Sequence, residues 1–149
     1  TDPLLWHHAC HTVDLFAYQT GGQPDIAWAQ QGPKHPVLGI SMDMTIGLRT
    51  RDTGALCTLA LSFNNDGPLG TFFRYICDNG TYIARYDDLV DGYDKAVDLS
   101  GVAVSNDGIE LQDREFVAAI REGREPNASV AQCLPAMQTL HRLEQALQP

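Results

Sequence analysis

Apolar residues near the start of the chain recur at the spacing of a helix. The positions i, i+4, i+8 and i+11 of one helical face are filled by Leu5, Ala9, Val13 and Phe16. The Gly21-Gly22 pair follows, and glycine commonly ends a helix because it adopts positive φ readily. The pattern predicts a helix from about Leu4 to Gln19 that packs on a core.

The middle of the chain alternates between apolar and polar residues at the period of a β-strand. An Asn79-Gly80 turn between two β-rich segments is typical of a hairpin. The strands that this pattern predicts are Asp25–Gln30, Ile40–Thr50, Ala55–Phe63, Thr71–Cys77 and Thr81–Tyr86, with a weaker one at Lys95–Leu99. The acidic stretch Asp87–Asp91 is interpreted as a solvated loop.

Helical periodicity returns in the last third of the chain. It predicts one helix over Leu111–Glu122 and another over Val130–Leu147, the second capped by Ser129. The expected apolar face of the first helix is Phe116, Val117, Ala119 and Ile120. The residues of the second helix expected to point inward are Val130, Leu134, Met137, Leu140, Leu143 and Leu147.

This order of elements predicts an α+β fold, in which helices pack on one face of a mostly antiparallel open sheet. The opposite face would carry small and polar residues, since Ser41, Asp43, Thr45 and Gly47 alternate with the apolar positions of their strand. A face of this kind is either exposed to solvent or a contact with another subunit. Alternation leaves both alternatives open.

Composition narrows the function classes. The chain has 149 residues, the length of a single domain, and a net charge of −9. This charge argues against sequence-independent nucleic-acid binding and against an anionic membrane surface. The four cysteines are far apart and no apolar segment is long enough to cross a membrane, so we expect a cytoplasmic protein with reduced thiols. The chain begins at Thr1, as a piece of a longer protein would.

A histidine cluster is the main candidate for chemistry. On a regular helix His7, His11 and Asp14 would share a face, while His8 would point elsewhere. Three interpretations stay open from the residues themselves. The histidines could be structural, the His7–His11 spacing could hold a metal ion, or His11 could transfer protons with Asp14 orienting it.

Two stretches together resemble the Gfo/Idh/MocA family of oxidoreductases. The segment Leu111–Pro126 is similar to a helix near the end of these proteins, and His11–Leu15 followed by Gly21-Gly22 is similar to the helix that opens their C-terminal domain. The resemblance implies that residues 1–149 form one substrate-binding and oligomerisation domain, with the fold of the glyceraldehyde-3-phosphate-dehydrogenase-like C-terminal domains. The N-terminal Rossmann domain that binds NADP or NAD would be missing, in agreement with the lack of a Gly-x-Gly-x-x-Gly motif.

The resemblance also implies roles for individual residues. His11 stands at the position of the family's catalytic histidine, and His7 stands where the family often has an aspartate. Residues 5–16, 64–67 and 73–76 are most similar to a branch that oxidises a carboxylated hemiacetal in aromatic catabolism with NADP. His8, Arg74 and Arg85 are then expected to bind the substrate, because arginine pairs with carboxylates in a fork.

Further expectations follow from the same resemblance. The chain by itself would be inactive, and homo-oligomers would form through the open sheet face. Two alternatives come from other classes of protein. The first is a metal-dependent enzyme or metal-binding module that uses His7, His11 and Asp14, and the second is a non-catalytic dimerisation domain.

Overall fold

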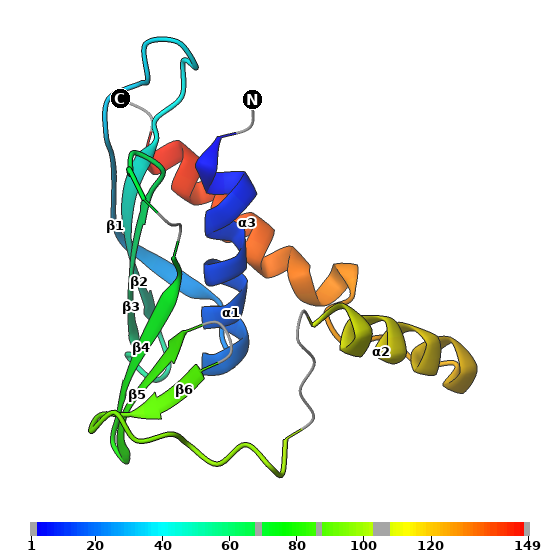
Figure 1. Ribbon diagram of the computed structural model, residues 1–149. Coiled ribbons are helices and arrows are strands. Elements are labelled where there is room, and N and C mark those ends of the chain that lie inside the picture. Colours follow the sequence, from blue (N-terminus) through cyan, green and yellow to red (C-terminus); the bar gives the residue numbers. More distant parts are fainter. Residues whose placement is uncertain (1–2, 68–69, 86–87, 103–107, 148–149) are drawn as a thin grey trace. The chain divides into compact units, whose positions relative to one another are not determined.

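The computed structural model in Figure 1 describes residues 3–67, 70–85, 88–102 and 108–147. Along the chain the elements are η1 (Leu5–Ala9), α1 (Cys10–Thr20), β1 (Pro24–Gln31), β2 (Asp43–Thr50), β3 (Leu56–Ser62), β4 (Phe72–Cys77), β5 (Gly80–Arg85), β6 (Asp88–Asp91), α2 (Ile109–Glu122) and α3 (Val130–Ala146). They divide into two compact units, one made of residues 1–65 with 128–149 and the other of residues 66–127. The predicted α+β class is confirmed, with the strands in two three-stranded antiparallel sheets instead of one.

The first unit contains the core. Its sheet has the order β1-β2-β3, and α1 and α3 pack together with η1 to cover one face of it. The apolar positions of β2 are the most deeply buried of the sheet, because Ile46 is 0% and Leu48 is 1% exposed. The helices contribute Leu5, Ala9, Val13, Phe16, Leu140 and Leu143 to the same cluster. The predicted buried face of the first helix is therefore confirmed.

The first helix is not regular over its whole length. Its first turn, η1, is a π-helix, and only from Cys10 does α1 follow as an α-helix. The α-helix ends where the sequence predicts, since Gly21 has φ of 69° and donates its backbone N–H to the Ala17 carbonyl. A π-helical turn is wider than an α-helical one and is often found at functional sites. The π-helical turn at Leu5–Ala9 therefore changes which side chains lie next to one another.

A bulge in β1 shapes the outer face of the first sheet. The register shifts between Ile26 and Trp28, so that Trp28 lies opposite Gly47 of β2. The indole rests directly on the glycine, because a Cβ built on Gly47 would be 2.2 Å from Trp28 Nε1. This close approach explains why the central strand carries a glycine at this position. Trp28 is 43% exposed on this face.

The second unit is built on the hairpin that the Asn79-Gly80 turn predicts. β4 and β5 pair from Phe72↔Arg85 to Cys77↔Gly80, and β6 pairs with β5. Two predictions in this region are wrong. Residues 88–91 form strand β6 instead of a loop, and Lys95–Leu99 contains only the isolated bridge Val90↔Ala96. The reason is that the Asp91 carboxylate accepts the Tyr93 and Lys95 N–H groups and so closes a turn after β6.

The strand predicted from Ile40 begins only at Asp43, and Ser41 is buried instead of facing outward, because its hydroxyl donates to the Gly32 carbonyl at 2.8 Å. Tyr86 and Asp87 fall outside the described ranges. Gly123 ends α2 with φ of 63°, and the Ser129 hydroxyl accepts the Gln132 N–H at 3.3 Å at the start of α3, as predicted.

The expected inward faces of α2 and α3 need correction. Of the apolar face predicted for α2, Phe116, Val117 and Ile120 are exposed and Ala119 is buried. In α3, Leu140 and Leu143 are buried as predicted, but Val130, Leu134 and Met137 are exposed. Ala136 and Thr139 take their place, giving a buried stripe at i, i+3, i+4 and i+7 from Ala136 to Leu143. Small residues at two of these positions let α3 approach the rest of the core closely.

Candidate active site

The π-helical turn brings two neighbouring histidines together. The ring centroids of His7 and His8 are 4.4 Å apart, and the His8 ring lies 4.5 Å from that of Phe63, just after β3. The prediction that His8 points away from the other histidines is therefore wrong. A π-turn has a smaller angular step between residues than an α-helix, so adjacent side chains diverge less. Phe63 then supports the His8 ring from the neighbouring strand.

This environment favours the uncharged form of His8. Partial burial lowers the pKa of its imidazole, and nearby His7 and His11 lower it further. A cation is disfavoured both by loss of solvent and by like charges, so all three causes act in the same direction. His7 and His11 are themselves exposed, which leaves their rings accessible from solvent. The cluster thus combines the partly buried His8, whose uncharged form is favoured, with the solvent-accessible rings of His7 and His11.

Asp14, three residues after His11 in α1, acts on a residue of α3. Its negative charge helps to raise the pKa of the Cys133 thiol in α3, an effect to which burial of the thiol contributes most. Among the described residues no hydrogen bond or ion pair joins Asp14 to His11. The structure therefore brings His7, His8 and His11 together but does not couple Asp14 to them.

The geometry does not support the metal-site interpretation. Within residues 3–67, 70–85, 88–102 and 108–147, no group of three or more His, Cys, Asp or Glu side chains is arranged to hold an ion. His7, His11 and Asp14 all belong to these ranges. All four cysteines are free. In the same ranges no helix is both long and apolar enough to span a bilayer.

One contact of the π-helical turn cannot be predicted from the sequence pattern. The Trp6 indole N–H donates a hydrogen bond of 2.8 Å to Glu144 Oε1 in α3, 138 residues away. The ring of Trp6 also packs against the core cluster. The indole therefore packs and forms a specific polar contact at the same time.

Arg74 and Arg85, the two arginines expected to bind carboxylates, share one face of the second sheet. Arg85 lies opposite Phe72, and Phe72 is two residues from Arg74 on β4, so the two guanidinium groups are diagonal neighbours. Both side chains are exposed, and neither forms an ion pair with another described residue. They are therefore free to bind an anion. The two arginines belong to the second unit, whereas the histidines belong to the first.

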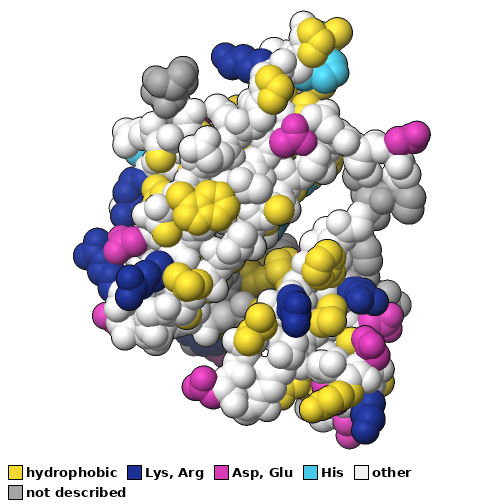
Figure 2. Space-filling model, turned by 90° about the vertical axis from the view of Figure 1, so that its left-hand side faces the viewer, with side chains coloured by type: hydrophobic (Ala, Val, Ile, Leu, Met, Phe, Trp, Pro, Cys, Tyr) yellow, Lys and Arg dark blue, Asp and Glu magenta, His cyan; other side chains and the backbone are white. Residues whose placement is uncertain are grey.

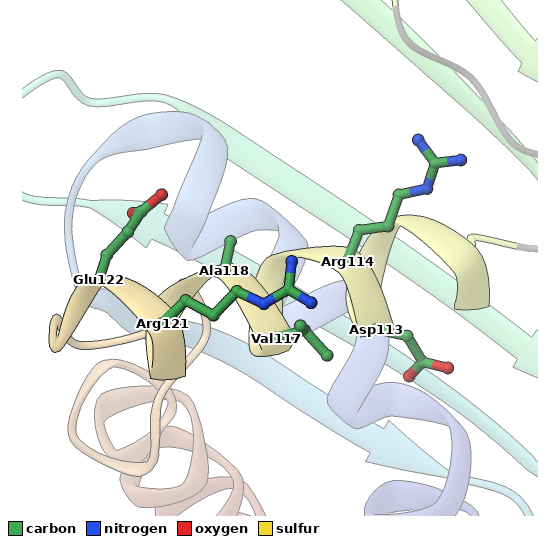
Figure 3. A pocket seen from close by; sticks show the side chains of 6 residues that line it. All are labelled: Asp113, Arg114, Val117, Ala118, Arg121 and Glu122. Atoms are coloured by element: carbon green, nitrogen blue, oxygen red, sulfur yellow. The ribbon is translucent and has the colours of Figure 1, made fainter.

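A hollow of about 390 Å³ runs along α2, and none of the histidines or arginines discussed above lines it. Figure 3 shows the side chains that line it, all of them from this helix: Asp113, Arg114, Val117, Ala118, Arg121 and Glu122. Arg114 is paired with Glu110 one turn earlier. Sequence reasoning assigned no role to these residues. The hollow is open and contains charges of both signs, so it does not select a ligand of one charge.

The exposed surface combines apolar and charged groups. Figure 2 shows one face of the molecule, where hydrophobic side chains form small separate groups among basic and acidic ones. Apolar residues exposed on the first sheet include Trp28 and Leu56, which is 74% exposed. On the same outer face stand Asp43, Thr45 and Gly47, as the alternation predicts.

Comparison with known proteins identifies the class. Residues 1–103 match the family model described as bacterial oxidoreductases, C-terminal. The chain belongs to this family of oxidoreductase C-terminal domains, and the resemblance stated from the sequence is confirmed. It is 69% identical over 148 residues to 4-carboxy-2-hydroxymuconate-6-semialdehyde dehydrogenase of Sphingobium sp. strain SYK-6. That match covers 99% of this chain and 46% of the dehydrogenase, so the chain spans about half the length of its curated relative.

Solved structures support the fold. An oxidoreductase domain protein from Kribbella flavida matches with a TM-score of 0.71 at 18% identity, over 93% of this chain and 46% of that one. An oxidoreductase from Agrobacterium radiobacter, solved in complex with NAD+, L-tartaric acid and magnesium, matches with a TM-score of 0.61 at 15% identity. This second match covers 93% of this chain and 45% of the other. At these identities the likeness concerns the fold.

Proposed function

We propose that this chain is the substrate-binding half of an NAD(P)-dependent dehydrogenase. Its reaction would be oxidation of the hemiacetal of 4-carboxy-2-hydroxymuconate-6-semialdehyde to 2-pyrone-4,6-dicarboxylate, in the protocatechuate 4,5-cleavage pathway of aromatic catabolism. The observation that carries the proposal is 69% identity over 148 residues to a dehydrogenase of that name. The match covers 99% of the chain, so it extends over the histidine turn and the β4–β5 hairpin.

The residues of the cluster suit the proton transfer that such an oxidation needs. A hemiacetal hydroxyl must lose its proton as the carbon is oxidised, and a neutral imidazole accepts protons near physiological pH. We assign this role to His11, which is exposed on α1. His7 is the neighbouring group through which the proton would pass to solvent. Asp14 would act at longer range, through its charge, since no hydrogen bond links it to His11 among the described residues.

Binding of the carboxylated substrate is assigned to three other side chains. The exposed Arg74 and Arg85 lie on one sheet face with no ion pair to described residues, and guanidinium groups bind carboxylates in a bidentate manner. His8, held between His7 and Phe63, presents a largely uncharged ring. A neutral imidazole can accept a hydrogen bond from a substrate hydroxyl or donate one to it without adding charge to the site.

The described residues do not form a dinucleotide site. All strand pairs are antiparallel, whereas a Rossmann site needs parallel strands linked by a helix and a glycine-rich turn. The residues present therefore do not fit the cofactor by themselves. We propose that NADP or NAD binds mainly to an N-terminal domain that would correspond to the rest of the relative's length.

We further propose that the protein is cytoplasmic and forms homo-oligomers, as dimers or larger assemblies, through the outer face of the first sheet. The support is the outer face around Gly47, where the apolar side chains of Trp28 and Leu56 are exposed among small and polar ones. The proposed partners are a small carboxylate and another copy of the chain, with no nucleic acid and no membrane. Light scattering of the protein at several concentrations measures its mass and tests the assembly.

The experiment that tests the proposed reaction is substitution of the general base. In the protein made from its complete reading frame, His11→Ala should lower turnover at least about 10²-fold, the usual effect of losing general-base catalysis. His35→Ala is the matched control, because His35 lies between β1 and β2 and its ring accepts the Val37 and Leu38 N–H groups, away from the cluster. Circular dichroism should show an intact fold in both variants. Unchanged turnover in His11→Ala would remove this residue from the mechanism.

A further inference from the structure

The π-helical turn that carries the histidines has few bonds of its own. Its five residues begin at Leu5, and the N-cap residue Leu4 forms no side-chain cap hydrogen bond. The Pro3 carbonyl is shared by the Trp6 and His7 N–H groups at 3.1 and 3.2 Å. Hydrogen-bond geometry in such short non-α turns is poorer than in an α-helix. Contacts with the rest of the protein must therefore hold the turn in place.

Two kinds of contact do this. On one side Leu5 and Ala9 are buried in the core, at 3% and 0% exposure. On the other side the Trp6 indole N–H donates to Glu144 Oε1 at 2.8 Å. The apolar contacts fix the depth of the turn, whereas the hydrogen bond is directional and fixes its rotation about the helix axis. Because Trp6 immediately precedes His7 and His8, any rotation at Trp6 moves both rings.

Glu144 has no other strong partner among the described residues. The nearest basic side chain in the described part of the chain is His141, whose Nδ1 is 3.9 Å from the second carboxylate oxygen, and no described lysine or arginine pairs with Glu144. Tryptophan is a donor only, and its N–H is partly buried here, so it needs an acceptor. The carboxylate supplies a charge-assisted one, which is the stronger kind of hydrogen bond.

We infer that Glu144 is a positioning residue of the active site: by accepting the Trp6 N–H it holds His8 against Phe63 and beside His7. This inference rests on the proposed function, in which His7 and His8 of the turn serve the proton path and substrate binding beside the general base His11. Glu144 acts through Trp6 and touches no reacting group. Its effect should appear in both kcat and KM, because His7 is assigned to the proton path and His8 to substrate binding.

The test uses the protein made from its complete reading frame, with histidine labelled for NMR. Trp6→Phe keeps an aromatic ring but lacks the N–H, Glu144→Leu keeps bulk but lacks the acceptor, and Glu144→Gln keeps an acceptor oxygen. Gln138→Leu, at an exposed position of the same helix, is the control for adding a leucine to α3. If Trp6→Phe does not fold, the comparison of Glu144→Leu with Glu144→Gln still tests the inference.

The ring-proton resonances of His8, assigned with a His8→Gln variant, report its stacking on Phe63 independently of turnover. Trp6→Phe and Glu144→Leu should move these resonances toward those of an unstacked histidine. Both should lower kcat/KM about tenfold or more, since small misplacements of groups that bind the substrate or transfer its proton are costly. Glu144→Gln should restore both properties, and the double variant should be no worse than either single one.

Resonances unchanged in Glu144→Leu, or a Glu144→Gln variant as defective as Glu144→Leu, would overturn the inference. His11→Ala, measured in parallel, tests the proposed function separately. If His11→Ala retains full turnover while the His8 resonances move in Glu144→Leu, the reaction has been assigned to the wrong residue and the positioning contact stands.

Discussion

The contact between Trp28 and Gly47 allows a sharp test of packing on the open sheet face. In Gly47→Ala the new methyl group would lie 2.2 Å from Trp28 Nε1 and 2.6 Å from Cε2. Carbon atoms in contact need about 3.5–4 Å. Because β2 is the central strand, paired on both sides, its backbone cannot retreat easily. The indole has to leave the surface of the sheet instead.

The cost of moving the indole follows from its burial. Trp28 is 43% exposed, so somewhat more than half of its surface is covered. A tryptophan side chain presents roughly 200 Å², which places the covered part at about 110 Å² and its full loss at roughly 3 kcal/mol. Part of the contact will re-form, and alanine is favoured over glycine in a strand by about 0.5–1 kcal/mol. We therefore expect a net destabilisation of about 1–2 kcal/mol.

The assay is urea unfolding followed by tryptophan fluorescence. The chain has two tryptophans, Trp6 and Trp28, and both lie in the first unit, so the signal reports that unit. In a Trp28→Ala background, where Trp6 alone reports, Gly47→Ala has no indole to displace and should stabilise the unit by about 0.5–1 kcal/mol. This reversal of sign is the critical result. If Gly47→Ala destabilises equally with and without the indole, the explanation from Trp28 is wrong.

Two other predictions concern the core and the end of α2. Leu140→Ala removes a fully buried side chain from α3 and should lower the unfolding free energy of the first unit by about 2–5 kcal/mol in the same assay, whereas Leu134→Ala, at a half-exposed position, should cost much less. Glu115 accepts hydrogen bonds from Arg124 and the Asn127 N–H, which lower its pKa from 4.5 to about 2. Since the folded pKa is depressed, this stabilisation is complete above pH 4.5 and is lost as the pH falls through about 2. Hydrogen exchange of the Asn127 amide should be slow at neutral pH and fast in Glu115→Leu, which lacks the acceptor oxygen, and equal rates in both proteins would refute the link.

The parts of the fold that the sequence predicts correctly are those with a local cause. Apolar spacing identified the buried face of the first helix, and Gly21, Gly80 and Ser129 marked ends and turns by their own backbone or side-chain chemistry. β6 was missed because it begins and ends with an aspartate. Its two apolar residues, Leu89 and Val90, are too few to show a period.

The candidate site was less predictable because its geometry depends on distant parts of the chain. Leu5, Ala9 and Val13 would be buried by an α-helical or a π-helical first turn alike, so their spacing carries no signal for η1. The position of His8 depends on this turn and on Phe63. The hydrogen bond from Trp6 to Glu144 joins residues 138 apart, and nothing near either one in the sequence indicates it.

The first unit is made from two segments separated by the whole of the second, and this has a consequence for biosynthesis. Leu140 and Leu143, which complete the core over β2, leave the ribosome only after residues 66–127 have been made. At roughly 5–20 residues per second, the sheet of the first unit must wait several seconds with its apolar face uncovered. A nascent chain stalled within the second unit would have all the strands of the first sheet and none of the helix that finishes its core. Such a chain is the form most exposed to aggregation and to the chaperones that prevent it.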